Sequence, residues 1–423
     1  MLTEKLDQPT APYGFVYPQY QTNCISNIPD TILELFGTKG APASPLTPRL
    51  NLDAKHYNKV VLLVVDGFGF NQYLNHHKTN PFLNKLPKAS EVFPLTSVYP
   101  SQTTNALTTL NTGITPQQHG LFEYFIYLKE TGIINALRFE RISTKKSKLT
   151  EQGYDPHLMY NGGNIQQKLE EEGIKTYTHM HESNASAACT KLVFEGSTII
   201  SSHKTSDAIV KLRKNLEQNS GAYFFVHIET LDTIAHEYGP QSEEYNAELE
   251  AITFLLQKEL VEKITPQAAK ETLLLITADH GEIQVDPQQT TYLSLNSHPI
   301  QNAEIGKHRK KIMPTGSPRD IFLHVKPHKL EETKEALQKS IGHKAQVVEM
   351  QEALKSGLFG YGEPSMDFLD RTGNLLVLPL GRETLWFEHR SGRKIPLQGQ
   401  HGGLSPDEML VPFAAANLNE LKR

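Results

Sequence analysis

Three apolar runs of this chain are each followed by an aspartate: Asp66, Asp232 and Asp279. Apolar runs of this kind are typical of buried strands, and the carboxyl ends of parallel strands meet at one edge of a sheet, where ligands bind. We therefore expect the three carboxylates to converge. Like charges that converge are costly unless a cation neutralises them. The pattern predicts a metal site at this edge.

Histidines accompany these aspartates. Asp232 and His236 are four positions apart, so they share one face of a helix. The same spacing also occurs in ordinary surface pairs. A second copy, Asp320 and His324, lies in a strand-like run. Four strand residues span about 13 Å, too far for one ion. We therefore interpret only the first copy as a candidate for metal binding.

Asp279 and His280 are adjacent in the sequence. On a continuing strand they would point to opposite faces, so they can bind one ion only at a turn beyond the strand. Gly281 permits such a turn. The alternative is that both residues lie in a solvated loop. This alternative is less favoured because the other aspartates are expected at the same edge of the sheet.

A candidate nucleophile lies at the expected start of a helix. Pro100 and Ser101 open a helical pattern that ends at Gly113, which places Thr103 and Thr104 in its first turn. Free N–H groups and the helix dipole favour an anion there, whether an alkoxide or a phosphate. Serine and threonine are also ordinary N-caps, and these residues alone leave that alternative open.

The elements expected to position these residues alternate between strands and helices. The runs at 60–65, 223–228 and 273–276 are typical of strands buried on both faces. Residues 241–260 have helical periodicity, with Ser242 as the expected N-cap. This alternation predicts an α/β fold around a mostly parallel sheet.

Residues 286–398 differ from the rest and are expected to form a smaller α+β insertion. The catalytic core would then comprise 1–285 and 399–423, with 409–413 as its last strand or edge element. Within the insertion we expect the following elements: strands at 319–325 and 345–348, a helix at 329–340, and a paired β segment at 374–379 and 384–389.

The composition of the chain excludes several classes of function. The chain has 423 residues, and 42 Lys and Arg against 47 Asp and Glu give a net charge of −5, without the positive charge of a protein that binds nucleic-acid polymers. The two cysteines, Cys24 and Cys189, are too few for a disulfide framework or a cysteine zinc site. No run reaches the roughly 20 apolar residues of a membrane span, and no signal segment is evident. We expect a soluble, cytoplasmic protein that is not bound to a membrane; the sequence predicts no oligomeric state.

Five motifs in order resemble the type I phosphodiesterase/nucleotide pyrophosphatase branch of the alkaline phosphatase superfamily. They are Val64–Gly69, Tyr99–Thr103 with Thr112–Gly120, Asp232–Pro240, Thr277–Glu282 and His401–Met409. The resemblance implies an alkaline-phosphatase-like three-layer sandwich, with helices on both faces of a mostly parallel sheet and the insertion as a cap.

The resemblance also implies two divalent metal ions, preferably zinc, with manganese as the alternative. One ion would be held by Asp66, Thr103, Asp279 and His280, and the other by Asp232, His236 and His401. Zinc accepts such nitrogen and oxygen ligands. Thr103 would be the nucleophile and form a phospho-threonine intermediate, which water activated by the metal then hydrolyses. His119 is expected to be structural.

The sequence departs from the family at one position. Eukaryotic nucleotide pyrophosphatases have an asparagine 21 residues after the threonine, where this chain has Tyr124. Tyr124, helped by Asn105, is expected to contact the phosphoryl oxygen. We find no arginine near the nucleophile to bind a dianionic monoester, which favours diesters. The residues that could still fold inward are Arg138, Arg141 and Arg319.

The sequence therefore predicts a hydrolase of phosphodiester or pyrophosphate bonds that acts on a small phosphodiester or nucleotide-like substrate. Two alternatives remain. One is a phosphonate or phosphomonoester hydrolase, or a phosphomutase, of the same superfamily. The other is a catalytically idle relative that only binds its ligand.

Overall fold

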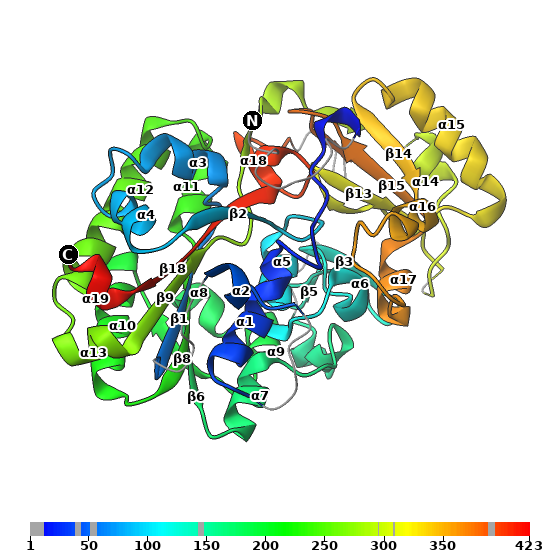
Figure 1. Ribbon diagram of the computed structural model, residues 1–423. Coiled ribbons are helices and arrows are strands. Elements are labelled where there is room, and N and C mark those ends of the chain that lie inside the picture. Colours follow the sequence, from blue (N-terminus) through cyan, green and yellow to red (C-terminus); the bar gives the residue numbers. More distant parts are fainter. Residues whose placement is uncertain are drawn as a thin grey trace.

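The computed structural model describes residues 12–38, 44–50, 57–142, 148–294, 296–307, 309–387 and 394–423. Its centre is a seven-stranded sheet with the order β2-β18-β9-β1-β8-β6-β7 (Figure 1). The strands are β1 (Lys59–Val65), β2 (Val92–Thr96), β6 (Lys175–His181), β7 (Thr198–Ser202), β8 (Ala222–Ile228), β9 (Thr272–Thr277) and β18 (Leu410–Asn417).

The middle of this sheet is parallel, as the sequence predicts. β1 pairs in parallel with β8 and β9, and all three are buried along their whole length. β18 runs antiparallel between β9 and β2, so the predicted last strand lies inside the sheet and β2 forms the edge. The three strands that lead to the aspartates are therefore neighbours.

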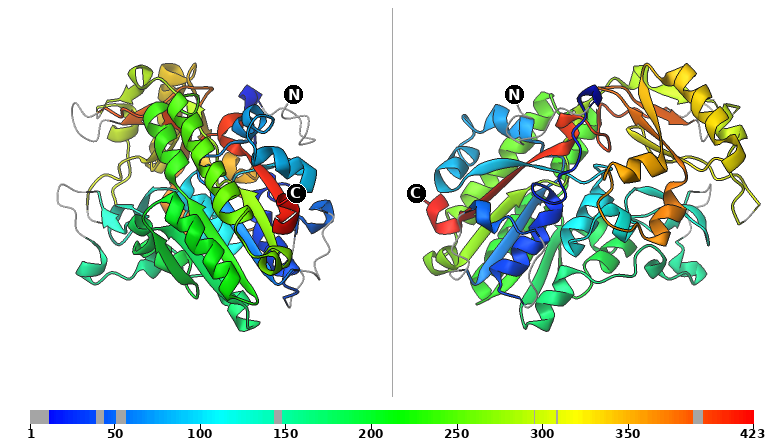
Figure 2. Two further views of the ribbon diagram at one scale, coloured as in Figure 1. Left: turned by 90° about the vertical axis from the view of Figure 1, so that its left-hand side faces the viewer. Right: turned by 45° about the vertical axis from the view of Figure 1, so that its right-hand side comes forward.

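Helices cover both faces of the sheet, which confirms the three-layer arrangement. On one face, α10 (Thr205–Gln218) and α12 (Glu243–Leu255) pack side by side (Figure 2, left). On the other face, α1 (Ile28–Leu35), α5 (Thr103–Thr112) and α7 (Ile165–Glu171) contact one another. Further helices are α2 (Thr47–Leu50), α3 (Phe70–His76), α4 (Leu86–Ala89), α6 (Pro116–His119), α8 (Glu182–Ala185), α9 (Ala188–Val193), α11 (Thr230–Tyr238), α13 (Pro266–Glu271), α18 (Pro406–Met409) and α19 (Leu418–Leu421).

The helix predicted at 241–260 begins where the sequence indicates. Ser242 Oγ accepts a hydrogen bond from Tyr245 N at 3.1 Å, so Ser242 is the N-cap. The helix continues beyond α12 as one π-helical turn, Leu256–Val261. Across the described residues, no helix combines the length and the apolar character needed to cross a membrane.

The insertion contains a four-stranded antiparallel sheet with the order β12-β13-β15-β14 (upper right in Figure 1). Its strands are β12 (Thr315–Ser317), β13 (Asp320–Leu323), β14 (Ala345–Glu349) and β15 (Leu375–Pro379), and its helices are α14 (His298–Gln301), α15 (Leu330–Ile341), α16 (Met350–Lys355) and α17 (Met366–Thr372). A separate cluster of buried apolar side chains lies between residues 293 and 387. Other buried residues of the same segment, including Phe322 and Phe368, belong to the main core, so the segment packs both on itself and on the rest of the chain.

The pairing expected between 374–379 and 384–389 is wrong. β15 lies between β13 and β14, so both of its edges are already hydrogen-bonded. β16 (Leu385–Phe387) instead pairs in parallel with β11 (Thr291–Leu293). The end of the expected segment, 388–389, lies outside the described residues.

The segment expected to form the cap contacts a small sheet from the first half of the chain. This sheet consists of β3 (Phe125–Leu128), β4 (Gly132–Asn135) and β5 (Glu140–Arg141). β3 contacts both β12 and α17 of the insertion. The segment that follows α6 therefore connects the cap to the core.

Candidate active site

The structure brings the three predicted aspartates together. Asp66 follows β1 directly, Asp279 lies two residues after β9, and Asp232 lies on α11 just after β8. Gly67 N donates to Asp279 Oδ1 at 3.4 Å. Gly67 has a left-handed φ of +72°, and a Cβ atom there would lie 3.1 Å from the Cα of Asp232. Only glycine allows the ends of β1 and α11 to approach so closely.

A first cluster surrounds Thr103. Thr103 Oγ1 lies 3.1 Å from His280 Nε2. The same nitrogen lies 3.2 Å from Asp279 Oδ2 and 3.5 Å from Asp66 Oδ1. Asp66, Asp279 and His280 are all buried. The four side chains predicted for one ion therefore share a single site.

Asp279 and His280 share this site because the chain turns after β9, as predicted, although Gly281 acts differently. Gly281 does not have a left-handed φ. A Cβ atom on it would lie 2.2 Å from the carbonyl oxygen of Asp407. Glycine is therefore required here for close packing and not for an unusual backbone angle.

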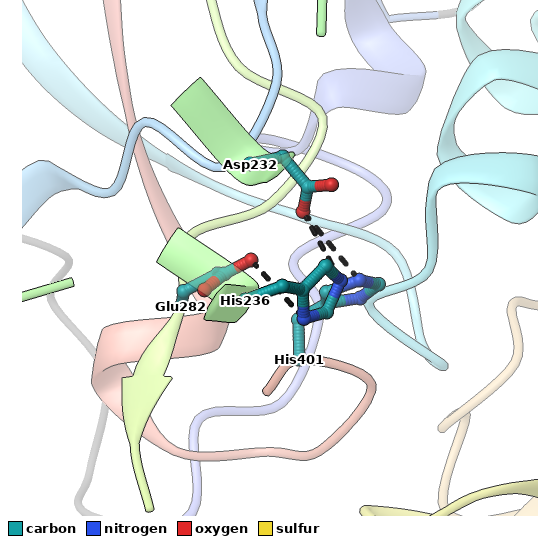
Figure 3. A group of neighbouring side chains, drawn as sticks. All are labelled: Asp232, His236, Glu282 and His401. Atoms are coloured by element: carbon teal, nitrogen blue, oxygen red, sulfur yellow. Dashed lines mark ion pairs between the residues drawn. The ribbon is translucent and has the colours of Figure 1, made fainter. Parts of the chain in front are cut away.

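A second cluster contains Asp232, His236 and His401 (Figure 3). Asp232 Oδ1 lies 3.5 Å from His236 Nε2 and 3.7 Å from His401 Nε2. Glu282 Oε1 approaches His236 from the other side, 3.8 Å from its Nδ1. Asp232 and His236 lie one turn apart on α11, as their spacing predicts.

Each of the three histidines is oriented by the backbone. In each ring Nδ1 faces a carbonyl oxygen, which can only accept, so Nδ1 carries a proton and Nε2 is the nitrogen that faces the site. The pairs are His236 with Gly399 O at 2.9 Å, His401 with Ser101 O at 2.9 Å, and His280 with Gly281 O at 3.1 Å. This is the tautomer that metal coordination through Nε2 requires.

The carboxylates also fit metal ions. Several carboxylate oxygens of the two clusters are buried and have no hydrogen-bond donor among the described residues: Asp66 Oδ1, Asp232 Oδ1, Asp279 Oδ2, and both Glu282 oxygens. Burial of such oxygens without a partner is costly. Their lone pairs, together with the Nε2 atoms of the three histidines, form the kind of nitrogen and oxygen donor set that zinc and manganese accept.

Charges in the site act strongly on one another. Burial raises the pKa of Asp66 well above its usual value, and Asp279 and Asp232 raise it further. Burial also raises the pKa of Asp232, but nearby His236 and His401 outweigh this effect and bring it below the usual value. Burial and the neighbouring His280 hold the pKa of His401 well below normal. The site therefore favours added positive charge at Asp66 and neutral imidazole at His401.

Two residues of the site were missed in the sequence. His227 of β8 has its Nε2 3.0 Å from Asp66 Oδ2, and Glu282 is fully buried beside His236. A signal for His227 exists, because it is the one strongly polar residue in an apolar run. Glu282 is the last residue of the Asp-His-Gly-Glu motif. The motif alone does not show where the Glu282 side chain points, because that depends on the turn at Gly281.

The helix predicted from Pro100 begins at Thr103. Gln102 is its N-cap, and no side chain caps the helix. Ser101 pairs instead with Gly402, and Ser101 Oγ accepts from Gly402 N at 3.0 Å. Thr103 is therefore the first helical residue, where backbone N–H groups lack partners within the helix.

The predicted substrate-binding residues differ in position. Tyr124 lines a cavity of about 760 Å³ that also exposes Thr103, Asp66 and Asp232. Asn105 does not line this cavity; it is fully buried, and its Nδ2 donates to Pro100 O at 2.7 Å. Asn105 therefore holds the turn before α5, and the expected contact with substrate is not supported.

None of the three arginines that could fold inward lines this cavity. Arg319 is fully buried and donates to Glu408 at 2.8 and 2.9 Å and to Gly381 O at 2.8 Å. Arg138 is exposed, and Arg141 lies near the hydroxyl of Tyr154. His119 is buried against Thr109, as expected for a structural residue.

Comparisons with known proteins agree with this geometry. A sequence model of the family described as type I phosphodiesterase/nucleotide pyrophosphatase matches residues 60–404. No curated protein matches the chain significantly by sequence.

Solved structures have the same fold. Murine ectonucleotide pyrophosphatase/phosphodiesterase 5 superposes with a TM-score of 0.60 at 17% identity, covering 86% of this chain and 93% of the murine chain. An inactive form of that protein in complex with AMP gives 0.59 at 17% identity, with coverage of 86% and 93%. The human protein gives 0.59 at 17% identity, with coverage of 86% and 92%.

The family match covers most of the chain, including Thr103 and every residue of the two clusters. The fold comparison agrees with it over a similar share of the chain. The chain therefore belongs to the type I phosphodiesterase/nucleotide pyrophosphatase family of the alkaline phosphatase superfamily and is a hydrolase that acts on phosphodiester bonds.

Proposed function

We propose that this protein hydrolyses a small phosphodiester or nucleotide-like substrate at a site for two divalent metal ions, with Thr103 as the nucleophile. Asp66, Thr103, Asp279 and His280 would hold one ion, and Asp232, His236 and His401 the other. The carboxylate oxygens without donors, which lie near histidines whose Nδ1 atoms are held by backbone carbonyls, carry this proposal. Zinc is preferred and manganese is the alternative, because both accept this donor set.

When bound, the ions would neutralise phosphoryl charge and lower the pKa of a coordinated hydroxyl. The chain positions the reacting groups. Thr103 Oγ attacks the phosphorus and forms the new P–O bond, while the bond to the leaving ester oxygen breaks and that oxygen takes a proton. The unpaired N–H groups of the first turn of α5 favour the phosphoryl oxygens there.

The phospho-threonine formed in this step is then hydrolysed. A water oxygen forms a bond to phosphorus, the bond to Thr103 Oγ breaks, and Thr103 regains its proton. Tyr124, which lines the cavity, is placed to donate to a phosphoryl oxygen. The products are an alcohol and a phosphomonoester.

The direct test replaces Thr103 with alanine in protein reconstituted with zinc or manganese. We expect turnover of an aryl phosphodiester to be lost while elemental analysis still finds metal. Thr109→Ala is the matched control, since Thr109 lies on the same helix but contacts His119. Full activity of Thr103→Ala would exclude this threonine as the nucleophile.

A substrate panel separates the related reactions. We expect a diester to be hydrolysed faster than a monoester or a phosphonoacetate-like compound, because no arginine lines the described cavity. A faster monoester or phosphonate reaction would instead favour the alternatives within the superfamily. A protein without metal that takes up neither zinc nor manganese would favour a catalytically idle binding protein.

A cytoplasmic location is also part of this proposal. Cys24 and Cys189 are buried, free thiols, which supports a reducing compartment. Fractionation of cells that express the tagged protein tests the location. Recovery outside the cytoplasm would contradict it.

A further inference from the structure

Two buried carboxyl groups, Glu123 and Asp320, meet away from the metal-binding clusters. Glu123 belongs to the loop before β3, and Asp320 is the first residue of β13. Both side chains are fully buried and within hydrogen-bonding reach of each other. Two carboxylates this close cannot both stay charged in a buried place, so a proton or a cation has to lie between them.

Each carboxyl group has one oxygen occupied and one left over. Glu123 Oε2 accepts from Tyr124 N at 2.5 Å and from Phe125 N at 3.5 Å. Asp320 Oδ1 accepts from Ser317 N at 3.2 Å and from the Ser317 hydroxyl. The other two oxygens, Glu123 Oε1 and Asp320 Oδ2, have no donor among the described residues. They are the atoms available for a shared proton.

Packing of aromatic rings keeps water away from this contact. Asp320 and Phe322 are two positions apart on β13, so their side chains emerge on the same face. On that face Phe322 packs against Phe122, which precedes Glu123, and against Phe359, with ring centroids 5.0 and 6.2 Å apart. Such surroundings favour the form of the pair with the smaller charge.

Asp320 holds its proton more tightly than Glu123 does. Burial and the neighbouring Glu123 raise the pKa of Asp320 well above its usual value. Burial also raises the pKa of Glu123, to about 7, but hydrogen bonds from Asp320 and from the N–H groups of Tyr124 and Phe125 limit the rise. Above about pH 7 the pair therefore has one proton, on Asp320, and one negative charge, on Glu123.

The basic side chains near the pair are already occupied. Arg319, the residue before Asp320, directs its guanidinium group at Glu408 and at two backbone carbonyl oxygens. Arg371 of α17 donates to three carbonyl oxygens at 2.7 Å and pairs with Asp367. Neither arginine therefore replaces the proton.

Two further titratable groups approach from the core. Burial and both carboxyl groups of the pair raise the pKa of Tyr99 well above its usual value, so its hydroxyl stays neutral. His401 is near as well, because a Cβ atom on Gly402 would lie 3.0 Å from Asp320 Oδ1. The ring nitrogens of His401 face Ser101 O and Asp232 instead.

The pair connects two walls of the catalytic cavity. Glu123, Tyr124 and Phe125 line one side, and Gly316 and Ser317 of β12 line another. Glu123 binds the backbone of Tyr124, and Asp320 binds Ser317. A proton between the two carboxyl groups therefore fixes how far apart these walls lie.

We propose that Glu123 and Asp320 are positioning residues that share one proton and thereby hold the β12–β13 hairpin against the loop that carries Tyr124. Loss of this proton in alkaline solution leaves two negative charges side by side and separates the walls. The inference rests on the proposed function, since it takes the cavity to bind the substrate, but the proton itself is measurable without turnover.

Urea denaturation at several pH values tests the shared proton. In the unfolded chain both groups lose their protons near pH 4, whereas the folded chain keeps them to higher pH. The urea midpoint should therefore fall more steeply in the unaltered protein than in Asp320→Asn as the pH rises from about 5 to about 9. Asparagine donates to Glu123 at any pH. Equal slopes would overturn the proposal.

Asp370→Asn is the matched control. Asp370 pairs with Lys129 and also links α17 to the end of β3, but both side chains are partly exposed. This variant should keep the pH dependence of the unaltered protein. The same loss of pH dependence in Asp370→Asn and Asp320→Asn would contradict a specific role of the buried pair.

Kinetics with bis(4-nitrophenyl) phosphate on metal-reconstituted protein tests the positioning. Glu123→Ala should raise KM about tenfold or more, with a smaller change in kcat, and Glu123→Gln should restore KM. The KM of the unaltered protein should also rise in alkaline buffer, and that of Asp320→Asn should not. If Glu123→Ala does not fold, these pH profiles decide; identical profiles would overturn the proposal.

Infrared spectroscopy separates failure of this inference from failure of the proposed reaction. At about pH 8 the difference spectrum should show the carbonyl stretch of a protonated carboxylic acid that Asp320→Asn lacks. This band without turnover of any diester would support the shared proton and contradict the reaction. Turnover without the band would support the reaction and overturn the inference. Calcium or magnesium held by the unaltered protein and lost from Asp320→Asn would also overturn it, because a cation would then join the carboxylates.

Discussion

Nε2 of His227 lies 3.0 Å from Oδ2 of Asp66, and both side chains are buried at the centre of the sheet. The contact follows from strand register. His227 is paired with Val64, and Asp66 lies two residues further along, so the side chains emerge on the same face. His227 therefore fixes one of the proposed metal-binding carboxylates.

We predict that His227→Ala lowers zinc or manganese affinity about 10- to 100-fold, the usual effect of removing a group that orients a ligand. His227→Gln should recover part of this loss, because its amide can donate to Asp66. Metal affinity is measured by competition with a chelator.

His179→Ala is the matched control for this prediction. His179 is buried on the neighbouring strand β6 and contacts Asn215, away from the site. The His179→Ala variant should lose folding stability but keep the metal affinity of the unaltered protein. Equal affinities of the His227 and His179 variants would show that the contact with Asp66 has no role in metal binding.

The buried pair Arg319–Glu408 should dominate the stability of the junction between cap and core. We predict that Arg319→Met lowers the free energy of unfolding by about 3–5 kcal/mol, because it leaves a buried carboxylate without its partner. Arg213→Met on α10 removes a partly exposed pair with Glu217 and should cost about 0.3–0.5 kcal/mol. Urea denaturation measures both. Similar losses in the two variants would contradict the prediction.

Acid should weaken the fold through His179. Burial lowers its pKa to about 4, and nearby Lys211 adds to this, whereas an unfolded histidine titrates near 6.5. As the pH falls from about 6.5 to about 4, the unfolded chain binds a proton that the folded chain does not. Stability therefore falls by up to about 1.4 kcal/mol per pH unit from this group.

His179→Gln removes this titration and keeps an acceptor for Asn215. Compared with the unaltered protein, the variant should lose less stability between pH 7 and pH 5 in urea denaturation. Identical pH dependence of the two proteins would show that His179 does not contribute.

Tyr124→Phe tests the group that stands where relatives have asparagine. Loss of a hydrogen bond to a charged phosphoryl group costs about 1.5–3 kcal/mol, so kcat/KM for a diester should fall about 10- to 100-fold. Tyr154→Phe is the control, because Tyr154 contacts Arg141 and does not line the cavity. A Tyr124→Phe variant with unchanged kcat/KM would assign the tyrosine to packing.

The parts of the site that depend on local sequence were predictable. Asp66 and Asp279 follow apolar strands, and Asp232 and His236 share a helix face, so strand ends and helical spacing were sufficient to group them. The copy at Asp320 and His324 lies along the cap strand β13 and its end, as its pattern indicated. His401 was found only through its motif, because nothing local indicates that it folds back to Ser101.

Contacts across long sequence separations were not predictable. His227 meets Asp66 through the register of two strands, 161 positions apart. Arg319 was one of three arginines that could have folded toward the substrate, but it pairs instead with Glu408, 89 positions away. The strand pair expected between 374–379 and 384–389 was also wrong: the two segments are close in sequence, but β13 and β14 already occupy both edges of β15.

The cap leaves and re-enters the core at one point: Val285 N donates to Gln398 O at 2.8 Å. Immediately afterwards the returning chain orients His236 through the carbonyl oxygen of Gly399 and supplies His401. A natural or engineered exchange of caps therefore has fixed limits. A module placed between those two ends would also have to supply a buried partner for Glu408, which Arg319 provides here, whereas the residues from Gln398 onward have to be inherited with the catalytic half.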